Sequence, residues 1–188
     1  MYGRRQLLVG ASAGAALLLA PSPARARRAK RPNFWVTVHA NHPLQATLGD
    51  ELDASAAAVV RALRGVEHWA SWVPMFAQSD LVSREGSRAT FDGKLDLPWP
   101  VRDRSFRADA QDQGTLGLSL QRVPGVGNMG DFSAMLTVSD LGDGRAQLSV
   151  DVEVDFGLRL TKGFIEWLAR IKAPDMFNAL EARAQAGG

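Results

Sequence analysis

The sequence predicts an α+β fold in which a curved antiparallel sheet wraps around a long C-terminal helix. Apolar residues alternate with polar ones in several segments between residues 91 and 156, as in strands that bury one face. A helical period is found over residues 56–63 and returns from Leu160 to the end of the chain. A long helix laid across one apolar sheet face covers it without filling all the space beneath, so a cavity is expected.

The chain is expected to begin its domain with two strands and two short helices. Residues 34–55 contain two strand-like runs around the turn-forming segment 41–43, followed by a helix cap at Asp53 or Ser55. A second short helix is predicted over residues 66–76. The apolar face of the first helix consists of Ala56, Val59, Val60 and Leu63.

The middle of the chain predicts an antiparallel meander of six or more strands. Apolar residues take alternate positions in residues 91–97, 116–120 and 148–156. Turn-forming segments separate these runs, which favours hairpins over helical crossovers. The turns are expected at residues 84–86, 113–114, 124–131 and 142–144.

The last part of the chain predicts one long helix. Phe164, Trp167, Leu168 and Ile171 follow a helical period, and Met176, Phe177 and Leu180 continue it after Pro174. Because proline inside a helix costs about 3 kcal/mol or more, we expect a kink or a restart near residues 172–175.

The stretch PWPVRDRSF, residues 98–106, predicts the corner between two strands. Pro98 and Pro100 cannot donate ladder hydrogen bonds, so one strand should end before them. If Phe106 points inward, the period of two places Arg104 on the same face, where it could orient the polar head of a ligand. Alternatively, Arg104 pairs with a neighbouring carboxylate at the rim of the sheet.

The first 26 residues predict an export signal. They contain Arg4-Arg5, an apolar run from Leu7 to Ala20, and the small-residue pattern Ala24-Arg25-Ala26. The arginine pair favours the twin-arginine route, with cleavage after Ala26 and release into the periplasm. An ordinary secretory signal and an uncleaved anchor are the alternatives. Residues 27–33 are expected to form a flexible basic tail and residues 34–188 the folded domain.

Charge and composition argue against several kinds of partner and site. The leader holds three of the 22 basic residues and no acid, so the remaining chain has 19 basic against 20 acidic residues and no nucleic-acid partner is expected. The basic residues 27, 28, 30 and 31 are expected to be solvated, with an anionic membrane surface as the alternative partner. Without cysteine there is no disulfide, thiolate metal site or thiol nucleophile.

Other motifs give no catalytic or cofactor site. Residues 125–130 match G-x-G-x-x-G, but the strand-like run that follows predicts a loop between strands and no dinucleotide site. The histidines His39, His42 and His68 lack the acidic companions of a metal site. No serine lies in a nucleophile elbow. We therefore expect no metal, no cofactor and no catalytic residue.

The chain resembles the START-like superfamily, the helix-grip fold of lipid-transfer domains and polyketide cyclases. Residues 50–76, 98–106 and 177–185 carry the resemblance: the opening strand with its helix pair, the proline and Arg-Asp-phenylalanine strand start, and the end of the long helix. START lipid-transfer domains are the most similar subgroup. Sterol-carrying members have a buried acid and arginine at the positions of Phe91 and Ala110, and this chain departs from that pattern.

The resemblance implies an apolar cavity between sheet and helix. We expect an exported, monomeric, non-enzymatic protein that binds and transfers one lipid or hydrophobic small molecule. The alternatives are a polyketide cyclase/dehydrase-like enzyme with His68, Arg104 or Arg122 as polar participants, and a partner-binding module whose cavity is filled. The expected ligand-contacting residues are Trp69, Trp72, Met75, Phe91, Leu95, Trp99, Arg104, Phe106, Arg122, Met135, Val152, Val154, Leu168, Ile171, Met176 and Phe177.

Overall fold

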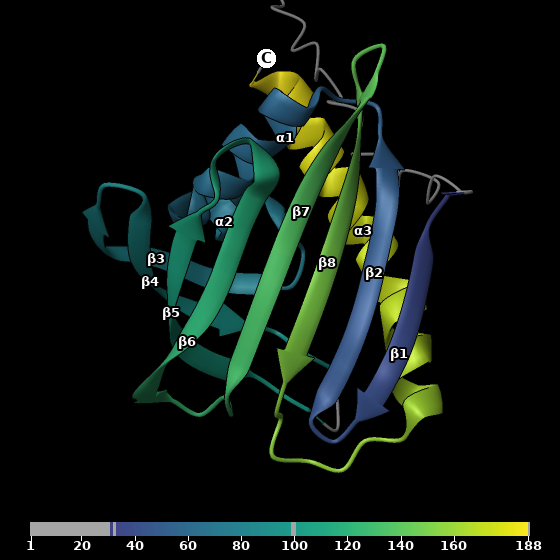
Figure 1. Cartoon of the computed structure of the whole chain (residues 1–188). Helices are drawn as coiled ribbons and strands as arrows, with labels where there is room; N and C mark the ends of the chain where they lie inside the picture. The colour runs from purple at the N-terminus through teal and green to yellow at the C-terminus, as the bar shows by residue number, and fades with distance from the viewer. Residues whose placement is uncertain (1–30, 32, 99–100, 188) are drawn as a thin grey trace, which may run out of the picture.

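The structure is a computed structural model that describes residue 31, residues 33–98 and residues 101–187 (Figure 1). Over these residues the strands form one antiparallel sheet of eight, in the order β1-β2-β8-β7-β6-β5-β4-β3. The strands are β1 (Trp35–Asn41), β2 (Leu44–Leu52), β3 (Phe76–Glu85), β4 (Arg88–Leu95), β5 (Arg104–Asp112), β6 (Gly117–Gly127), β7 (Phe132–Gly142) and β8 (Arg145–Val154). The helices are α1 (Ala56–Arg64), α2 (Trp69–Trp72) and α3 (Lys162–Ala186), with 3-10 turns at Val66–His68 and Gly114–Leu116.

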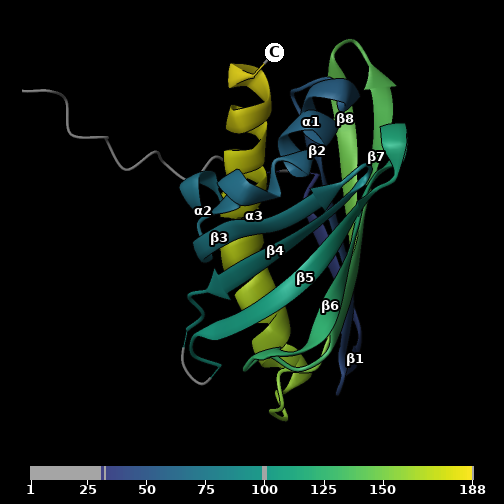
Figure 2. The same ribbon diagram turned by 90° about the vertical axis from the view of Figure 1, so that its left-hand side faces the viewer.

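The predicted α+β architecture is confirmed. Figure 2 shows the sheet curling around α3, with α1 and α2 beside the C-terminal half of that helix. No helix in the described part of the chain is long and apolar enough to cross a membrane.

The alternation of the central strands determines which side chains face α3. Val152 of β8 lies opposite Ala46 of β2 and Ala134 of β7, so these three side chains share the concave face. The intervening Asp151 and Glu153 lie on the convex face, where Thr47 Oγ1 donates a hydrogen bond to Asp151 Oδ1 at 2.7 Å. The prediction of one apolar and one polar face per strand is therefore confirmed for β8.

Side-chain caps define where the helices begin. Ser55 Oγ accepts a hydrogen bond from the Ala58 backbone N–H at 3.4 Å, so Ser55 and not Asp53 caps α1. Thr161 Oγ1 accepts from the Phe164 N–H at 3.3 Å, which starts α3 two residues after Leu160. The second predicted helix is a 3-10 turn followed by the short α2.

The long helix passes through Pro174 without a break. The expected restart near residues 172–175 is wrong, because α3 is helical from Lys162 to Ala186. The buried Ala173 and Phe177 lie on either side of the proline and pack against the core. We attribute the continuity to this packing, which offsets the loss of the proline N–H.

The segment that matches G-x-G-x-x-G spans the end of β6 and the connection to β7, so the predicted loop over residues 124–131 is shorter than expected and covers residues 128–131. β6 continues to Gly127, and β7 begins at Phe132 with no helix between them. Gly127 has φ +77°, and a Cβ there would lie 2.0 Å from the carbonyl oxygen of Ser105. Close backbone packing against β5 accounts for this glycine, and no phosphate site is needed to explain it.

The buried core forms two clusters. The main cluster lies under α1 and the second half of α3 and contains a chain of edge-to-face aromatic contacts, Trp69 to Phe91, Phe91 to Phe106, and Phe106 to Phe132. The lower cluster lies at the start of α3 and consists of Val38, Ala46, Leu97, Val101, Leu160 and Ile165.

Candidate ligand-binding site

The concave face of the sheet is buried at both ends and partly exposed between them. Leu120, Ala134 and Val152 form one cross-strand row over β6, β7 and β8, and all three are partly exposed. On one side of this row Phe132 and Val154 are buried, and on the other side Val138 and Leu148 are buried. Ala46 in the same row and Leu136 in the next row are buried, so the exposure is confined to part of these rows. We call this partly exposed part of the concave face the hollow.

The walls of this hollow are apolar. Leu48 and Val150 extend the partly exposed area by one more row, on β2 and β8. Four partly buried side chains, one of them Val152 of the row above, pack against both core clusters and so connect them. These are Leu44, Leu95, Val152 and Phe156.

Arg104 is a polar group at the lower end of the hollow. It begins β5 opposite Leu95, on the same face as Phe106 two residues later. Its Nη1 donates to the Asp103 carbonyl at 3.2 Å and its Nη2 to the Phe156 carbonyl at 3.4 Å, while its Nε is buried without a hydrogen-bond partner. The Asp103 carboxylate pairs instead with Lys94 at 3.0 Å. The alternative that Arg104 pairs with a neighbouring carboxylate therefore does not hold here.

Arg122 lies on the adjacent strand β6 and faces the same way. It pairs in register with Ala108 of β5, and its side chain is 11% exposed. Nη1 forms an ion pair with Asp131 Oδ1 at 3.2 Å and Nη2 donates to the Val126 carbonyl at 3.3 Å. Its Nε is also buried without a partner. Two guanidinium groups thus leave a buried N–H donor each on an otherwise apolar face.

Trp72 supplies a third buried donor. It packs against the main cluster from α2, and its indole Nε1 has no hydrogen-bond partner. Buried donors without a partner are uncommon in native proteins and suggest a group that binds there. Each of these donors, taken singly, suits a carboxylate, phosphate or carbonyl oxygen.

The other charged groups of the central strands face away from the hollow. Arg107 of β5 forms an ion pair with Asp92 at 2.7 Å, and hydrogen bonding to Arg107 holds the pKa of the Asp92 carboxyl below its ordinary value. Hydrogen bonding to Arg88 does the same to the pKa of Asp109. These pairs stabilise charge on the convex face and are not part of the site. No group of three or more His, Asp or Glu that could hold a metal ion is found among the described residues.

The structure divides the expected ligand-contacting residues into four sets. Partly buried on the concave side, beneath α2 or on α3 are Trp72, Met75, Leu95, Arg104, Arg122, Val152, Leu168, Ile171 and Met176. Fully packed in the main cluster are Trp69, Phe91, Phe106, Val154 and Phe177. Met135 is on the convex face. Trp99 lies outside the described residues.

The expectation that Met135 contacts the ligand is wrong. It lies opposite Ser119 and Asp151 and is 41% exposed, because its neighbours Ala134 and Leu136 take the inward positions of β7.

The structure also corrects the alternative in which His68 takes part in catalysis. His68 is exposed at the start of α2, so it is not placed to act as an acid or base inside the hollow.

Several wall residues were missed by sequence reasoning. Leu48, Leu120, Ala134 and Val150 are small or aliphatic, and nothing in their type separates them from core residues. Their alternation predicted the inward face, but partial exposure depends on how far α3 lies from the sheet.

Solved structures confirm the fold. A STAR-related lipid transfer protein from Xanthomonas axonopodis aligns with a TM-score of 0.66 and 17% identity, covering 83% of this chain and 96% of that one. The Zhui aromatase/cyclase from Streptomyces sp. R1128 aligns with a TM-score of 0.62 and 15% identity, over 77% of this chain and 98% of that one. Human STARD10 aligns with a TM-score of 0.63 and 13% identity, over 83% and 71%. No curated protein matches the sequence.

The similar structures include both transfer proteins and enzymes. Two di-domain aromatase/cyclases, StfQ and BexL, also share the fold. The expectation of a non-enzymatic protein is therefore wrong. The matching family model and the similar structures both include cyclases, so the resemblance does not exclude an enzyme. The family model for polyketide cyclase/dehydrase and lipid transport proteins matches residues 45–185. The predicted START-like resemblance is confirmed, and the chain belongs to the polyketide cyclase/dehydrase and lipid transport family.

Proposed function

We propose that this protein binds one apolar molecule with a polar or anionic head in the hollow between the sheet and α3, and transfers it to another membrane or protein. The observation that carries this proposal is the partly exposed row Leu120, Ala134 and Val152 between buried rows. Removing the apolar surface of a ligand from water supplies about 25 cal/mol per Å², part of which offsets the cost of association. The family membership supports an apolar ligand.

Arg104 and Arg122 are the groups proposed to orient the head of the ligand. Each offers a buried Nε–H donor, and each guanidinium is already fixed by hydrogen bonds to backbone carbonyls. A fixed donor loses little side-chain entropy when it binds an oxygen. A carboxylate, phosphate or carbonyl oxygen of an apolar ligand would satisfy either donor.

A second candidate is catalysis of the cyclase/dehydrase type in the same hollow. Buried donors fixed beside an apolar space can stabilise negative charge that develops on a substrate oxygen. Arg104 or Arg122 would then stabilise the partial negative charge on the oxygen of a polarised substrate carbonyl. The two functions differ in whether the bound compound is altered.

The first prediction concerns the contribution of Arg104 and Arg122 to ligand binding. Replacing Arg104 or Arg122 by glutamine should weaken binding of an anionic apolar compound about 10- to 100-fold, because a charge-assisted hydrogen bond is lost. The matched control is Arg107→Gln, on the same strand as Arg104 but on the convex face. Binding is measured by displacement of the apolar dye N-phenyl-1-naphthylamine, and the native ligand is identified by extraction and mass spectrometry.

The outcomes of this experiment separate the hypotheses. A compound recovered unchanged after incubation supports binding and transfer, and its conversion at a rate that depends on Arg104 supports catalysis. A protein that retains no compound and admits no dye contradicts both.

We further propose that the protein is exported to the periplasm, with residues 1–26 as a twin-arginine signal that is cleaved after Ala26. This segment lies outside the described residues, and the proposal depends on its arginine pair, its apolar run and its small residues. Folding in the cytoplasm would let a protein of this pathway be exported in its native state.

The second prediction tests this route. Replacing Arg4 and Arg5 together by lysine should leave the precursor in the cytoplasm, because the route depends on the arginine pair and not on charge. The control Arg27→Lys with Arg28→Lys makes the same chemical change behind the cleavage site and should not affect export. Cell fractionation and N-terminal sequencing measure the result, and normal export of the Arg4/Arg5 variant would refute the twin-arginine route.

A further inference from the structure

The second half of α3 is firmly attached to the rest of the fold. Ala173, Phe177, Leu180 and Ala184 are buried at intervals of three or four residues along this half. The ring of Phe177 also packs against Phe34, with a centroid distance of 6.0 Å. These contacts belong to the main cluster, the better packed end of the concave face.

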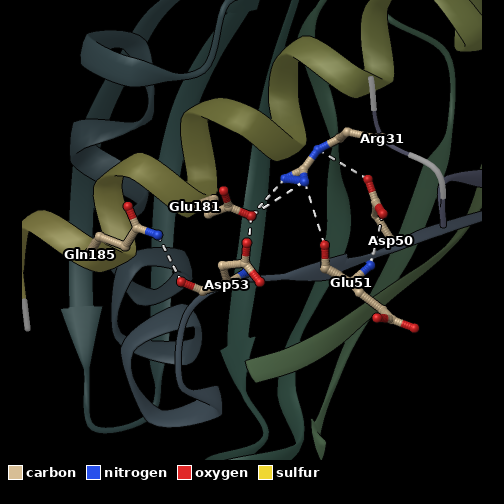
Figure 3. A network of polar contacts seen from close by, with 6 residues as sticks. All are labelled: Arg31, Asp50, Glu51, Asp53, Glu181 and Gln185. Atoms are coloured by element: carbon tan, nitrogen blue, oxygen red, sulfur yellow. Dashed lines mark hydrogen bonds and ion pairs between the residues drawn. The ribbon is translucent and has the colours of Figure 1, made fainter. Parts of the chain in front are cut away.

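A polar network reinforces this attachment (Figure 3). Arg31 Nε forms an ion pair with Asp50 Oδ2 of β2 at 3.1 Å, and Arg31 Nη2 forms one with Glu181 Oε2 of α3 at 3.0 Å. Glu181 Oε2 also accepts the backbone N–H of Asp53 at 3.0 Å, and Gln185 Nε2 donates to the Asp53 carbonyl at 2.7 Å. We name Arg31, Asp50 and Glu181 the Arg31 clamp.

The clamp lies inside the protein and not on its surface. Asp50 is 2% exposed, and the Arg31 side chain is nearly as buried. Burial raises the pKa of the Asp50 carboxyl, against the opposing effect of the Arg31 guanidinium. The expectation of a solvated, flexible tail over residues 27–33 therefore does not hold at Arg31, while residues 27–30 lie outside the described residues.

The first half of α3, residues 162–172, is held much less firmly. Ile165 is its one buried residue, and Trp167 is 52% exposed. Lys162 forms its ion pair with Glu166 at 3.8 Å, within the helix itself. Within the described residues, no ion pair ties this half to the sheet. It covers the lower cluster together with Phe156, whose carbonyl accepts a hydrogen bond from Arg104.

Pro174 separates the two halves. It has no backbone N–H, so the carbonyl of Arg170 lacks the usual helical hydrogen bond at this point. A helix is easiest to bend where this bond is missing. The clamp therefore ties the half that follows the proline, and the half before it has no ion pair to the sheet among the described residues.

We propose that the Arg31 clamp holds the second half of α3 in place while the first half, residues 162–172, moves about Pro174 to open the hollow. This inference rests on the proposed binding of an apolar ligand and adds where that ligand enters. The structure assigns the movement to the half of the helix that precedes Pro174.

The third prediction is a difference in hydrogen exchange along α3. In the ligand-free protein, amides of residues 164–172 should exchange at least about tenfold faster than those of residues 177–185, because local opening needs fewer buried contacts to break. Glu181→Gln should speed exchange of residues 177–185 roughly tenfold and leave residues 164–172 unchanged, since it removes a charged partner of Arg31. Glu166→Gln is the matched control and should not affect residues 177–185.

Two outcomes would overturn the proposal without reference to any ligand. One is faster exchange in residues 177–185 than in residues 164–172 of the unmodified protein. The other is a Glu181→Gln variant whose second half exchanges as slowly as before. Because exchange needs no ligand, these results are independent of the proposed function.

Uptake of N-phenyl-1-naphthylamine tests the entrance itself. Gly163→Ala should slow uptake up to about fivefold, because alanine stabilises the first turn of α3 and a Cβ at this position meets no atom within 4 Å. Pro174→Ala should slow it further by restoring the missing N–H. Slower uptake with unchanged equilibrium affinity supports the proposal. If uptake is unchanged in both variants while the dye still binds, the entrance lies elsewhere and only this inference fails.

Discussion

Replacing Phe106 by alanine should lower the free energy of unfolding by about 3–5 kcal/mol, as for other buried aromatic residues that leave a cavity. Phe106 is 4% exposed and makes ring contacts with Phe76, Phe91 and Phe132 at centroid distances of 6.2, 5.9 and 5.0 Å. Deleting one ring removes three aromatic contacts at once. Urea unfolding followed by tryptophan fluorescence measures the effect, and Leu116→Ala, at a side chain that is 65% exposed, should change it little.

Gly93 provides a sharper test of the same packing. A Cβ on this residue would lie 2.4 Å from Cζ of Phe106, so Gly93→Ala should destabilise the protein by about 1–3 kcal/mol through overpacking. In the Phe106→Ala background the same change should cost much less, because the opposing ring is gone. An equal cost in both backgrounds would show that the two residues do not compete for the same space.

Replacing Arg31 by methionine should lower the free energy of unfolding by about 3–5 kcal/mol at neutral pH, because it leaves a buried carboxylate without its partner. Asp50 is 2% exposed and Glu181 lies on the other side of the same guanidinium. Urea unfolding at pH 7 measures this change in the free energy of unfolding. The double variant Arg31→Met with Asp50→Asn should be less destabilised than Arg31→Met alone, since no buried charge is then left unpaired.

The pH dependence of the Arg31→Met variant has a defined sign. Burial raises the pKa of Asp50 above its unfolded value, and loss of the Arg31 guanidinium removes the interaction that lowers it. Between the unfolded and folded pKa values the folded chain binds a proton that the unfolded chain does not, so stability increases as the pH falls through this window. The difference in free energy of unfolding between the variant and the unmodified protein should therefore narrow as the pH falls from 7 toward the ordinary pKa of an aspartate carboxyl. A difference that is constant or widens would contradict a charged Asp50 as the cause.

The period of the apolar residues was sufficient to predict the sheet, the position of the long helix and the inward face of β8. These features depend on neighbours within a few residues, which the sequence displays directly. The same alternation should have excluded Met135, because it is out of phase with the inward Ala134 and Leu136. Met135 was chosen for its residue type, whereas the alternation along β7 predicts correctly that it faces outward.

The clamp could not be predicted from the sequence. Arg31, Asp50 and Glu181 are separated by up to 150 residues, and they meet only because β2 and α3 are adjacent in the folded chain. Arg31 in particular follows a run of basic residues that is typical of a solvated tail. Its burial depends on two carboxylates whose positions only the fold determines.

By itself, the sequence determined the fold class, the apolar inner face of the sheet and the position of Arg104 on that face, because strand and helix periods are local properties of the chain. The tertiary structure decided that part of that face is exposed between buried residues, that two arginines have buried donors without a hydrogen-bond partner, and that Arg31 pairs with both β2 and the second half of α3. Each of these depends on the distance between elements far apart in sequence, which no local pattern records.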